Sequence, residues 1–509
     1  MHLSRRTILA AGASGLVLPF LRVPARAARA PGMLTFGLSS YPPSFAPWVQ
    51  AGTAAGTVNL LLHRGLTSYG PDGQVRGELA ESWERADETS WVFHLRDAVF
   101  HNGAPVTAED VKWTLEQVAA EKSTAYMRGQ FQGVARIDTP DARTVRIVMQ
   151  QPTVTLPLWL AAYQMPIIAK GTGAGGSQPV GCGPFVLAAQ EHGVSLELTG
   201  FDKFYRPGLP KLKRIRLVAY ADESARVAAL QAGDVDLIEY VPWQAMQAVE
   251  ADPKLRLDAT DGPFMYITFN GATGPFTDAR VRLAVSHAIK RDEIVKAVFY
   301  GRGRELGGLP IAPDSPFYDK DLARGWAYDP AKSKQLLAAA GVPDGFACTL
   351  LSTAQYGMHK GTAELVQQHL AEIGIQVELA LPDWATRVNL GNRGQYQFSI
   401  SGTTADSNDP DGLAGLLDGS LGASIARSYN LRLPKLEQLL AAGRSEFDET
   451  KRRAIYLDLQ REALEQVPAA FLAWRSQGYA MAKDVEGFRN MPGALTFYSG
   501  TTLETTGIG

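Results

Sequence analysis

The sequence predicts a mixed α/β protein with at least two lobes. Its 509 residues exceed what a single hydrophobic core usually supports. Strand-like and helix-like segments alternate through the middle and C-terminal parts of the chain, a pattern that favours largely parallel sheets. The sequence contains no short-period repeat and no coiled-coil pattern, so we predict the fold class from the alternation of strands and helices.

The first thirty residues predict an export signal rather than a part of the fold. Arg5 and Arg6 form a twin-arginine pattern, an apolar stretch continues to Leu21, and small residues then offer cleavage after about Ala27 or Ala30. An amphipathic arm is the alternative. The apolar stretch is shorter than the roughly 20 residues that span a bilayer, and no cysteine marks a lipid attachment site. We therefore expect a twin-arginine signal peptide at residues 1–30 and a soluble mature protein in the periplasm.

The charge of the cleaved chain argues against nucleic acid as a partner. The chain has 50 Lys and Arg and 52 Asp and Glu, and residues 1–30 contain five of the arginines and none of the acids. Cleavage leaves 45 basic residues against 52 acidic ones, a formal charge of −7. Such a chain lacks the basic stripe that neutralises phosphates.

Local signals locate individual elements along the chain. Apolar residues alternate at Trp91, Phe93 and Leu95, which predicts a half-buried strand, and Thr107 with Asp110 resembles a capping box that opens a helix. Later segments show the same succession of helix caps, helices and short strands. They are a helix at residues 223–232 between Asp222 and Gly233, a strand at 235–238, a helix from 329–330 to Gly341, a helix at 362–373 and a strand at 375–379.

Several literal strings resemble one family. They lie at residues 79–83, 91–97, 100–103 and 107–111, then at 180–185, where Cys182 replaces a threonine, at 228–236 and at 275–284. Together they resemble the extracellular solute-binding proteins of family 5, the dipeptide- and oligopeptide-binding group that delivers ligands to ABC importers. The resemblance covers nearly the whole mature chain.

The resemblance implies the two-lobed periplasmic binding protein fold, type II, of the large cluster C type. Lobe I would comprise residues 31–263 and 475–509, with an extra subdomain at about 66–178, and lobe II residues 264–474. Chain crossings near 263–269 and 471–474 would form a hinge that closes around the ligand. Cys182 and Cys348 then fall in different lobes, where a disulfide would lock the hinge, so we expect two free thiols.

Asp406 is the main candidate for ligand binding. In the string at residues 402–412 it resembles the family aspartate that precedes Asp-Pro and pairs with the α-amino group of a peptide. A solvated turn is the alternative, and it is our interpretation for Asp409 and Asp411. A calcium loop is a further alternative, but Pro410 interrupts it and its carboxylates match poorly.

The other candidates follow from the same resemblance. Thr403 stands where peptide binders have a tryptophan, and residues 352–356 lack the arginine that holds a dipeptide carboxylate. Arg387, His359 or Lys360 could supply that charge, with a surface position as the alternative for each. Segments that the family places near the cleft contain Tyr41, Cys182, Trp384 and Tyr498, and core packing is the alternative for the three aromatic residues.

The sequence therefore predicts a periplasmic receptor that captures a small peptide or peptide-like solute and delivers it to the inner-membrane permease subunits of an ABC transporter. We expect a monomer without cofactor or metal. The same scaffold with a sugar, an opine, glutathione or a metal chelate is the alternative. A secreted hydrolase is disfavoured because the chain has neither Gly-x-Ser-x-Gly nor His-Glu-x-x-His.

Overall fold

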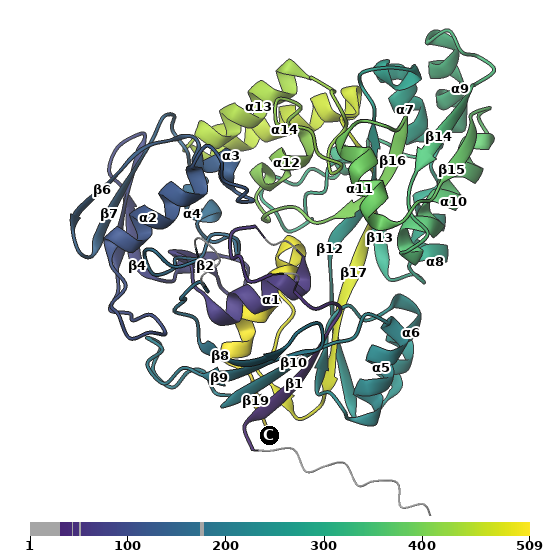
Figure 1. Cartoon of the computed structure of the whole chain (residues 1–509). Helices are drawn as coiled ribbons and strands as arrows, with labels where there is room; N and C mark the ends of the chain where they lie inside the picture. Colours follow the sequence, from purple (N-terminus) through teal and green to yellow (C-terminus); the bar gives the residue numbers. More distant parts are fainter. Residues whose placement is uncertain (1–30, 43, 50–51, 174–177) are drawn as a thin grey trace, which may run out of the picture.

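The computed structural model describes residues 31–42, 44–49, 52–173 and 178–509, so the predicted signal peptide lies outside the described residues. Within this part of the chain, an eleven-stranded sheet joins the two halves of the molecule (Figure 1). Its order is β15 (Gln376–Ala380), β14 (Ala347–Leu351), β16 (Phe398–Thr403), β12 (Leu255–Phe269), β17 (Ala470–Ala482), β11 (Leu237–Ile238), β1 (Met33–Leu38), β10 (Arg214–Ala219), β9 (Ser195–Gly200) and β8 (Phe185–Glu191), with β13 (Gly303–Glu305) beside β17.

The long strands β12 and β17 pass from one half to the other as an antiparallel pair. Residues 255–261 of β12 pair with 476–482 of β17, and after a register shift residues 264–267 pair with 470–474. The shift falls at Gly262, where a Cβ atom would lie 1.8 Å from the carbonyl oxygen of Gly493. A glycine is therefore required at the point where one predicted crossing enters the second half.

The prediction of largely parallel sheets is wrong for the sheet as a whole. Parallel pairing joins β1 to β10 and β11, and β14 to β15 and β16. The other pairs are antiparallel, because β8 and β9 form a hairpin and the two crossing strands run in opposite directions. The α/β class and the two-lobed arrangement are confirmed, whereas the lobe boundaries stay a prediction. We keep the names lobe I and lobe II for the ranges given above.

Helices cover both lobes. Lobe I has α1 (Thr53–Leu62), α5 (Glu223–Ala232), α6 (Trp243–Ala251) and the 3₁₀ helix η4 (Gly493–Glu504). Lobe II has α7 (Ala279–Ala288), α8 (Arg291–Val298), α9 (Pro330–Ala339), α10 (Gly357–Ala371), α11 (Trp384–Asn392), α12 (Ala414–Leu417), α13 (Pro434–Ser445) and α14 (Glu449–Gln466). Helix α10 begins five residues before its predicted start, and the Asp222 cap of α5 is confirmed by its bond to the backbone N–H of Ala225.

The extra segment of lobe I forms a compact unit of its own. Its sheet has the order β4 (Ala80–Arg85), β5 (Ser90–Leu95), β7 (Thr144–Met149), β6 (Val134–Asp141). Around it lie α2 (Ala108–Ala119), α3 (Arg128–Phe131), α4 (Leu156–Trp159) and the ribbon of β2 (Thr67–Tyr69) and β3 (Val75–Gly77). The capping box at the start of α2 is confirmed, since the Asp110 carboxylate accepts bonds from both the backbone N–H and the hydroxyl of Thr107.

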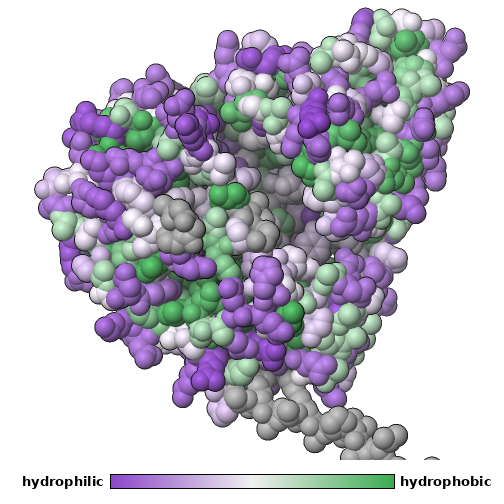
Figure 2. All heavy atoms as spheres, in the orientation of Figure 1, coloured by the Kyte–Doolittle hydropathy of each residue, from purple (hydrophilic) through white to green (hydrophobic). Residues whose placement is uncertain are grey.

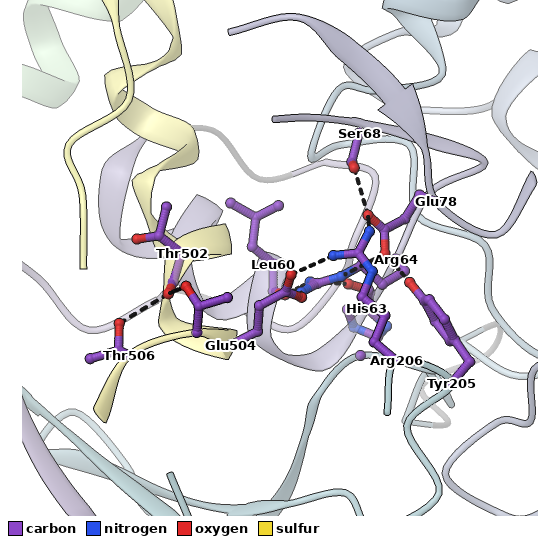
Figure 3. A network of polar contacts seen from close by, with 12 residues as sticks. Leu60, His63, Arg64, Ser68, Glu78, Tyr205, Arg206, Thr502, Glu504 and Thr506 are labelled. Carbon is purple, nitrogen blue, oxygen red and sulfur yellow. Dashed lines mark hydrogen bonds and ion pairs between the residues drawn. The ribbon is translucent and has the colours of Figure 1, made fainter. Parts of the chain in front are cut away.

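A buried network of charges ties distant segments of lobe I together (Figure 3). Arg64 pairs with Glu504 at 2.7 Å and with Glu78 at 3.2 Å, and Arg206 pairs with Glu78 at 2.7 Å and also with Glu504. The side chains of the two glutamates are at most 3% exposed. The network therefore joins the C-terminal helix η4 to the base of the extra subdomain.

Candidate ligand-binding site

A small hollow of about 30 Å³ lies between the extra subdomain and lobe II. Figure 2 shows this face of the molecule, with polar side chains over both lobes and a depression between them. The subdomain contributes Met127, Gln130, Thr155, Leu158, Trp159 and Ala162 to the walls, and lobe II contributes Asp406, Ser407, Asp411, Gly412, Ala414, Gly415 and Arg444. A cavity of this size holds water rather than a solute, so solute binding requires its two walls to move apart.

Asp406 presents its carboxylate to this hollow from the loop that follows β16. The hydroxyl of Tyr126 donates a 2.9 Å hydrogen bond to Asp406 Oδ1 across the two lobes. Burial raises the pKa of Asp406 to about 6, and the bond from Tyr126 opposes that rise. Among the described residues, no Lys or Arg lies within ion-pair distance of this carboxylate. A desolvated carboxylate without a cation of its own favours a cationic ligand.

Tyrosine rings form the wall beside Asp406. The Tyr498 ring lies 5.2 Å from that of Tyr69 and 5.1 Å from that of Tyr163, and its hydroxyl donates to the backbone carbonyl of Asp406 at 3.4 Å. Burial raises the pKa of each of these three tyrosines, so their hydroxyls stay neutral. Tyr126 differs because 46% of its surface is exposed. Most of the surface of this wall is thus the apolar faces of aromatic rings, with hydroxyl groups at its edge.

Asp409 and Asp411 are not solvated turn residues, which corrects the sequence interpretation. Asp409 forms a bidentate pair with Arg452, with two bonds of 2.8 Å, and Asp411 pairs with Arg444 at 2.9–3.2 Å. Both carboxylates are thereby neutralised. Two of the carboxylates that a calcium loop would need are therefore paired with arginines. In the described ranges, no group of three or more His, Cys, Asp or Glu is arranged to hold a metal ion.

Trp384 and Arg387 meet in the first turn of α11. The Arg387 guanidinium lies 4.8 Å from the Trp384 ring centre and donates to the backbone carbonyl of Ile400 and to Ser401 Oγ. Only 2% of Arg387 is exposed, and burial lowers its pKa to about 10. His359 is equally buried, so the surface interpretation is wrong for both residues. It holds for Lys360, which is exposed and lies 3.7 Å from Glu364.

The remaining candidates lie in separate places. Thr403 ends β16 opposite Phe264, three residues before Asp406. Tyr41 bonds to Gln190 at 3.3 Å at the edge of lobe I. Cys182 is 1% exposed within the core of the extra subdomain, where burial raises its pKa to about 12. The structure therefore brings Asp406 and Tyr498 together and pairs Trp384 with Arg387. It places Thr403 at the end of β16 and leaves Tyr41 and Cys182 apart. Their roles in binding stay predictions.

Sequence reasoning missed the subdomain side of the hollow. Tyr126, Met127, Gln130 and Trp159 line it or bond across it without belonging to any quoted motif. The available signal was an aromatic residue in the polar segment at residues 121–126, which would have marked Tyr126 as a candidate.

Comparisons with known proteins agree with this architecture. The family described as bacterial extracellular solute-binding proteins, family 5 Middle, matches residues 74–424. This chain belongs to that family. The solved structure of the PBP AgaA in complex with agropinic acid from A. tumefaciens R10 is 38% identical, covers 94% of this chain and 99% of its own, and superposes with a TM-score of 0.86.

Two curated relatives extend the comparison. The glutathione-binding protein GsiB of Pectobacterium atrosepticum is 26% identical over 476 residues, 90% of this chain and 92% of the relative. The di/tripeptide-binding protein 1 of Pseudomonas aeruginosa is 27% identical, over 85% of this chain and 87% of the relative.

The chain is thus a solute-binding receptor of an ABC transporter, and the family is one of substrate-binding proteins rather than enzymes. The ligand belongs in the cleft between the two α/β lobes. Among the described residues no helix combines the length and the apolar composition that a membrane span requires.

Proposed function

We propose that this receptor works as a periplasmic monomer and binds a small peptide-like solute, opines included, whose protonated amine pairs with Asp406. The observation that carries the proposal is the unpaired Asp406 carboxylate in the interlobe hollow. The names of the relatives support the ligand class, since they include glutathione, di- and tripeptides and agropinic acid. After export through the twin-arginine signal, the closed form would deliver the solute to the membrane permease subunits.

The fold supports a hinge for this capture. The paired strands β12 and β17 connect the lobes, and their register breaks at Gly262. Lobe I at residues 31–263 and 475–509 and lobe II at 264–474 would then close as rigid bodies. Thr403 and Tyr498 would contact the solute beside Asp406. Three further residues stay candidates: Tyr41 at the edge of the cleft, Cys182 in the core and Trp384 on α11.

The test is calorimetry with a free-amine solute and its N-acetylated form. Asp406→Asn keeps the shape and removes the charge, which leaves a buried ammonium against a neutral dipole. Such a truncation costs roughly 2–5 kcal/mol, so we expect the affinity for the free amine to fall about 30-fold or more. Binding of the acetylated solute should change little.

Asp314→Asn is the matched control, because it removes the charge of an exposed aspartate. Asp411→Asn is unsuitable because it would unpair Arg444. Equal affinity of the wild type and Asp406→Asn for the free amine would show that the receptor does not use the amine anchor. The same scaffold would then bind its solute through other groups.

A further inference from the structure

Ser476 of β17 binds three other segments of the chain at the point where this strand crosses from one lobe to the other. Its backbone N–H donates to the carbonyl of Arg302 at 3.2 Å, and its own carbonyl accepts from Trp243 Nε1 at 2.8 Å. Its hydroxyl donates to Asp261 Oδ1 at 2.5 Å. Trp243 begins α6 of lobe I, Asp261 lies on β12, and Arg302 precedes β13 of lobe II. One residue thus holds both lobes and both crossing strands.

Two ion pairs flank Ser476, and each joins a carboxylate of lobe I to an arginine of lobe II. Glu250 of α6 accepts two bonds from the Arg302 guanidinium, at 2.8 and 2.5 Å. Asp261 Oδ2 accepts from Arg304 Nε at 2.6 Å. A bidentate pair fixes the relative orientation of its partners as well as their distance. The two pairs therefore align α6 and β12 with residues 302–304.

A ring contact and a glycine bring the two sides of this region close together. The Trp243 ring lies 5.0 Å from the Phe299 ring, edge to face, and the two side chains are 9% and 0% exposed. At Gly303, a Cβ atom would lie 2.2 Å from the carbonyl oxygen of Trp474, so a glycine is required for β13 to pair with β17. We call the whole set the rear contact: Trp243, Glu250 and Asp261 from lobe I, and Phe299, Arg302 and Arg304 from lobe II.

The rear contact and the interlobe hollow lie on opposite sides of the crossing strands. Figure 1 shows α6 and α8 on one side of β12 and β17, and the extra subdomain on the other. That subdomain forms one wall of the hollow. In a rigid rotation, the displacement of a group grows with its distance from the axis. A rotation about the crossing strands therefore separates the walls of the hollow widely but moves the rear contact little.

We propose that the rear contact is a pivot that stays intact while the lobes rotate, so that the cleft opens only on the side of the extra subdomain. Two strands alone would let the lobes bend and twist in several directions. The ion pairs and the ring contact on α6 restrict this motion to one direction. A solute then enters and leaves past the extra subdomain. The pivot goes beyond the proposed function, because it does not depend on the chemistry of the solute or on Asp406.

Hydrogen exchange of the ligand-free wild-type protein tests the pivot without any variant. A backbone hydrogen bond joins the lobes on each side of the crossing strands. On the side of the hollow the N–H of Val154 donates to the Arg444 carbonyl, and on the rear side the N–H of Ser476 donates to the Arg302 carbonyl. Both donor residues are half-buried. Since opening exposes only the first bond, we expect the Val154 amide to exchange on the order of 100-fold faster, corrected for intrinsic rates. Equal protection of the two amides, or faster exchange at Ser476, would overturn the proposal.

Chemical bridges provide a second test, with small-angle scattering of ligand-free protein as the measurement. A short bismaleimide links the cysteines of Glu250→Cys/Arg302→Cys on the rear side. The matched bridge on the side of the hollow uses Arg85→Cys/Phe447→Cys, because the Arg85 guanidinium lies 3.9 Å from the Phe447 ring of lobe II. The two native cysteines are buried.

We expect the bridge on the side of the hollow to lower the radius of gyration, because it removes open molecules from the population. The rear bridge should leave the radius unchanged, because it links groups that already stay together. A rear bridge that lowers the radius as much as the other bridge would show that the rear contact separates on opening. A bridge across the hollow without effect would show that the cleft does not open on that side. Either result would overturn the pivot.

Discussion

Thr155→Val tests whether one interlobe hydrogen bond holds the closed state. The Thr155 hydroxyl, in the extra subdomain, donates to Asp411 Oδ2 of lobe II at 3.0 Å, and the backbone N–H of Val154 donates to the Arg444 carbonyl at 2.9 Å. Valine keeps the shape of the threonine side chain and removes only the hydroxyl. In the open state Thr155 and Asp411 would face water, so the substitution penalises the closed state alone.

The magnitude follows from what remains bound to Asp411. A hydrogen bond to a charged group contributes roughly 1.5–3 kcal/mol. Arg444 Nε still lies 3.2 Å from the same carboxylate oxygen, so the carboxylate is not left without a partner. We therefore expect the substitution to destabilise the closed state by the lowest value of this range, about 1.5 kcal/mol. The ratio of closed to open protein then falls about tenfold. Because the solute binds tightly only in the closed form, its dissociation constant should rise by the same factor.

The assay is calorimetry with the solute that native mass spectrometry identifies in protein purified from its own host. Thr153→Val is the matched control, because the Thr153 hydroxyl is also buried but donates to the Gln151 carbonyl of its own segment at 3.0 Å. Equal dissociation constants for the two variants would refute the reasoning, since only one of the lost bonds crosses between the lobes.

Three further predictions concern stability, pH and export. Glu504→Gln removes a counter-charge from the buried Arg64 and the partly buried Arg206, so it should lower the free energy of unfolding in urea by roughly 3–5 kcal/mol. Glu197→Gln, which breaks an exposed pair, should change this free energy by less than about 1 kcal/mol. The pKa of Asp406 is higher in the folded than in the unfolded protein, so the ligand-free protein should lose stability as pH rises from about 4 to 6. At pH 7 the free energy of unfolding of Asp406→Asn should therefore exceed that of the wild type by on the order of 1–2 kcal/mol. At pH 3 this difference should disappear. Coincident urea curves of the two proteins at pH 7 would contradict this. Replacing Arg5 and Arg6 with lysines should block accumulation in the periplasm, and normal accumulation would indicate a general secretory signal.

Local chemistry was predictable from the sequence. The capping box at Thr107 and the cap at Asp222 depend on residues three positions apart, and both are as expected. The position of Asp406 followed from the resemblance, and the structure places it at an interlobe hollow. These features need no information about which distant segments meet.

Partners far apart in the chain were not predictable. Asp411 is neutralised by Arg444, 33 residues later, and Asp406 accepts a bond from Tyr126, 280 residues earlier. Sequence reasoning kept a surface position as the alternative for Arg387 because arginine is mostly exposed. Its actual burial depends on the backbone of β16 and on the Trp384 ring, which only the tertiary fold brings together.

The charges along the loop at residues 402–412 explain how one carboxylate of this loop could select a solute with a cationic group. Asp409 and Asp411 are each neutralised by an arginine, so Asp406 alone presents an uncompensated negative charge to the hollow. A buried carboxylate is costly without a counter-charge, and the amine of a bound solute would offset that cost. A solute without an amine would leave the Asp406 carboxylate unpaired, so the closed state should favour a free-amine solute over its N-acetylated form.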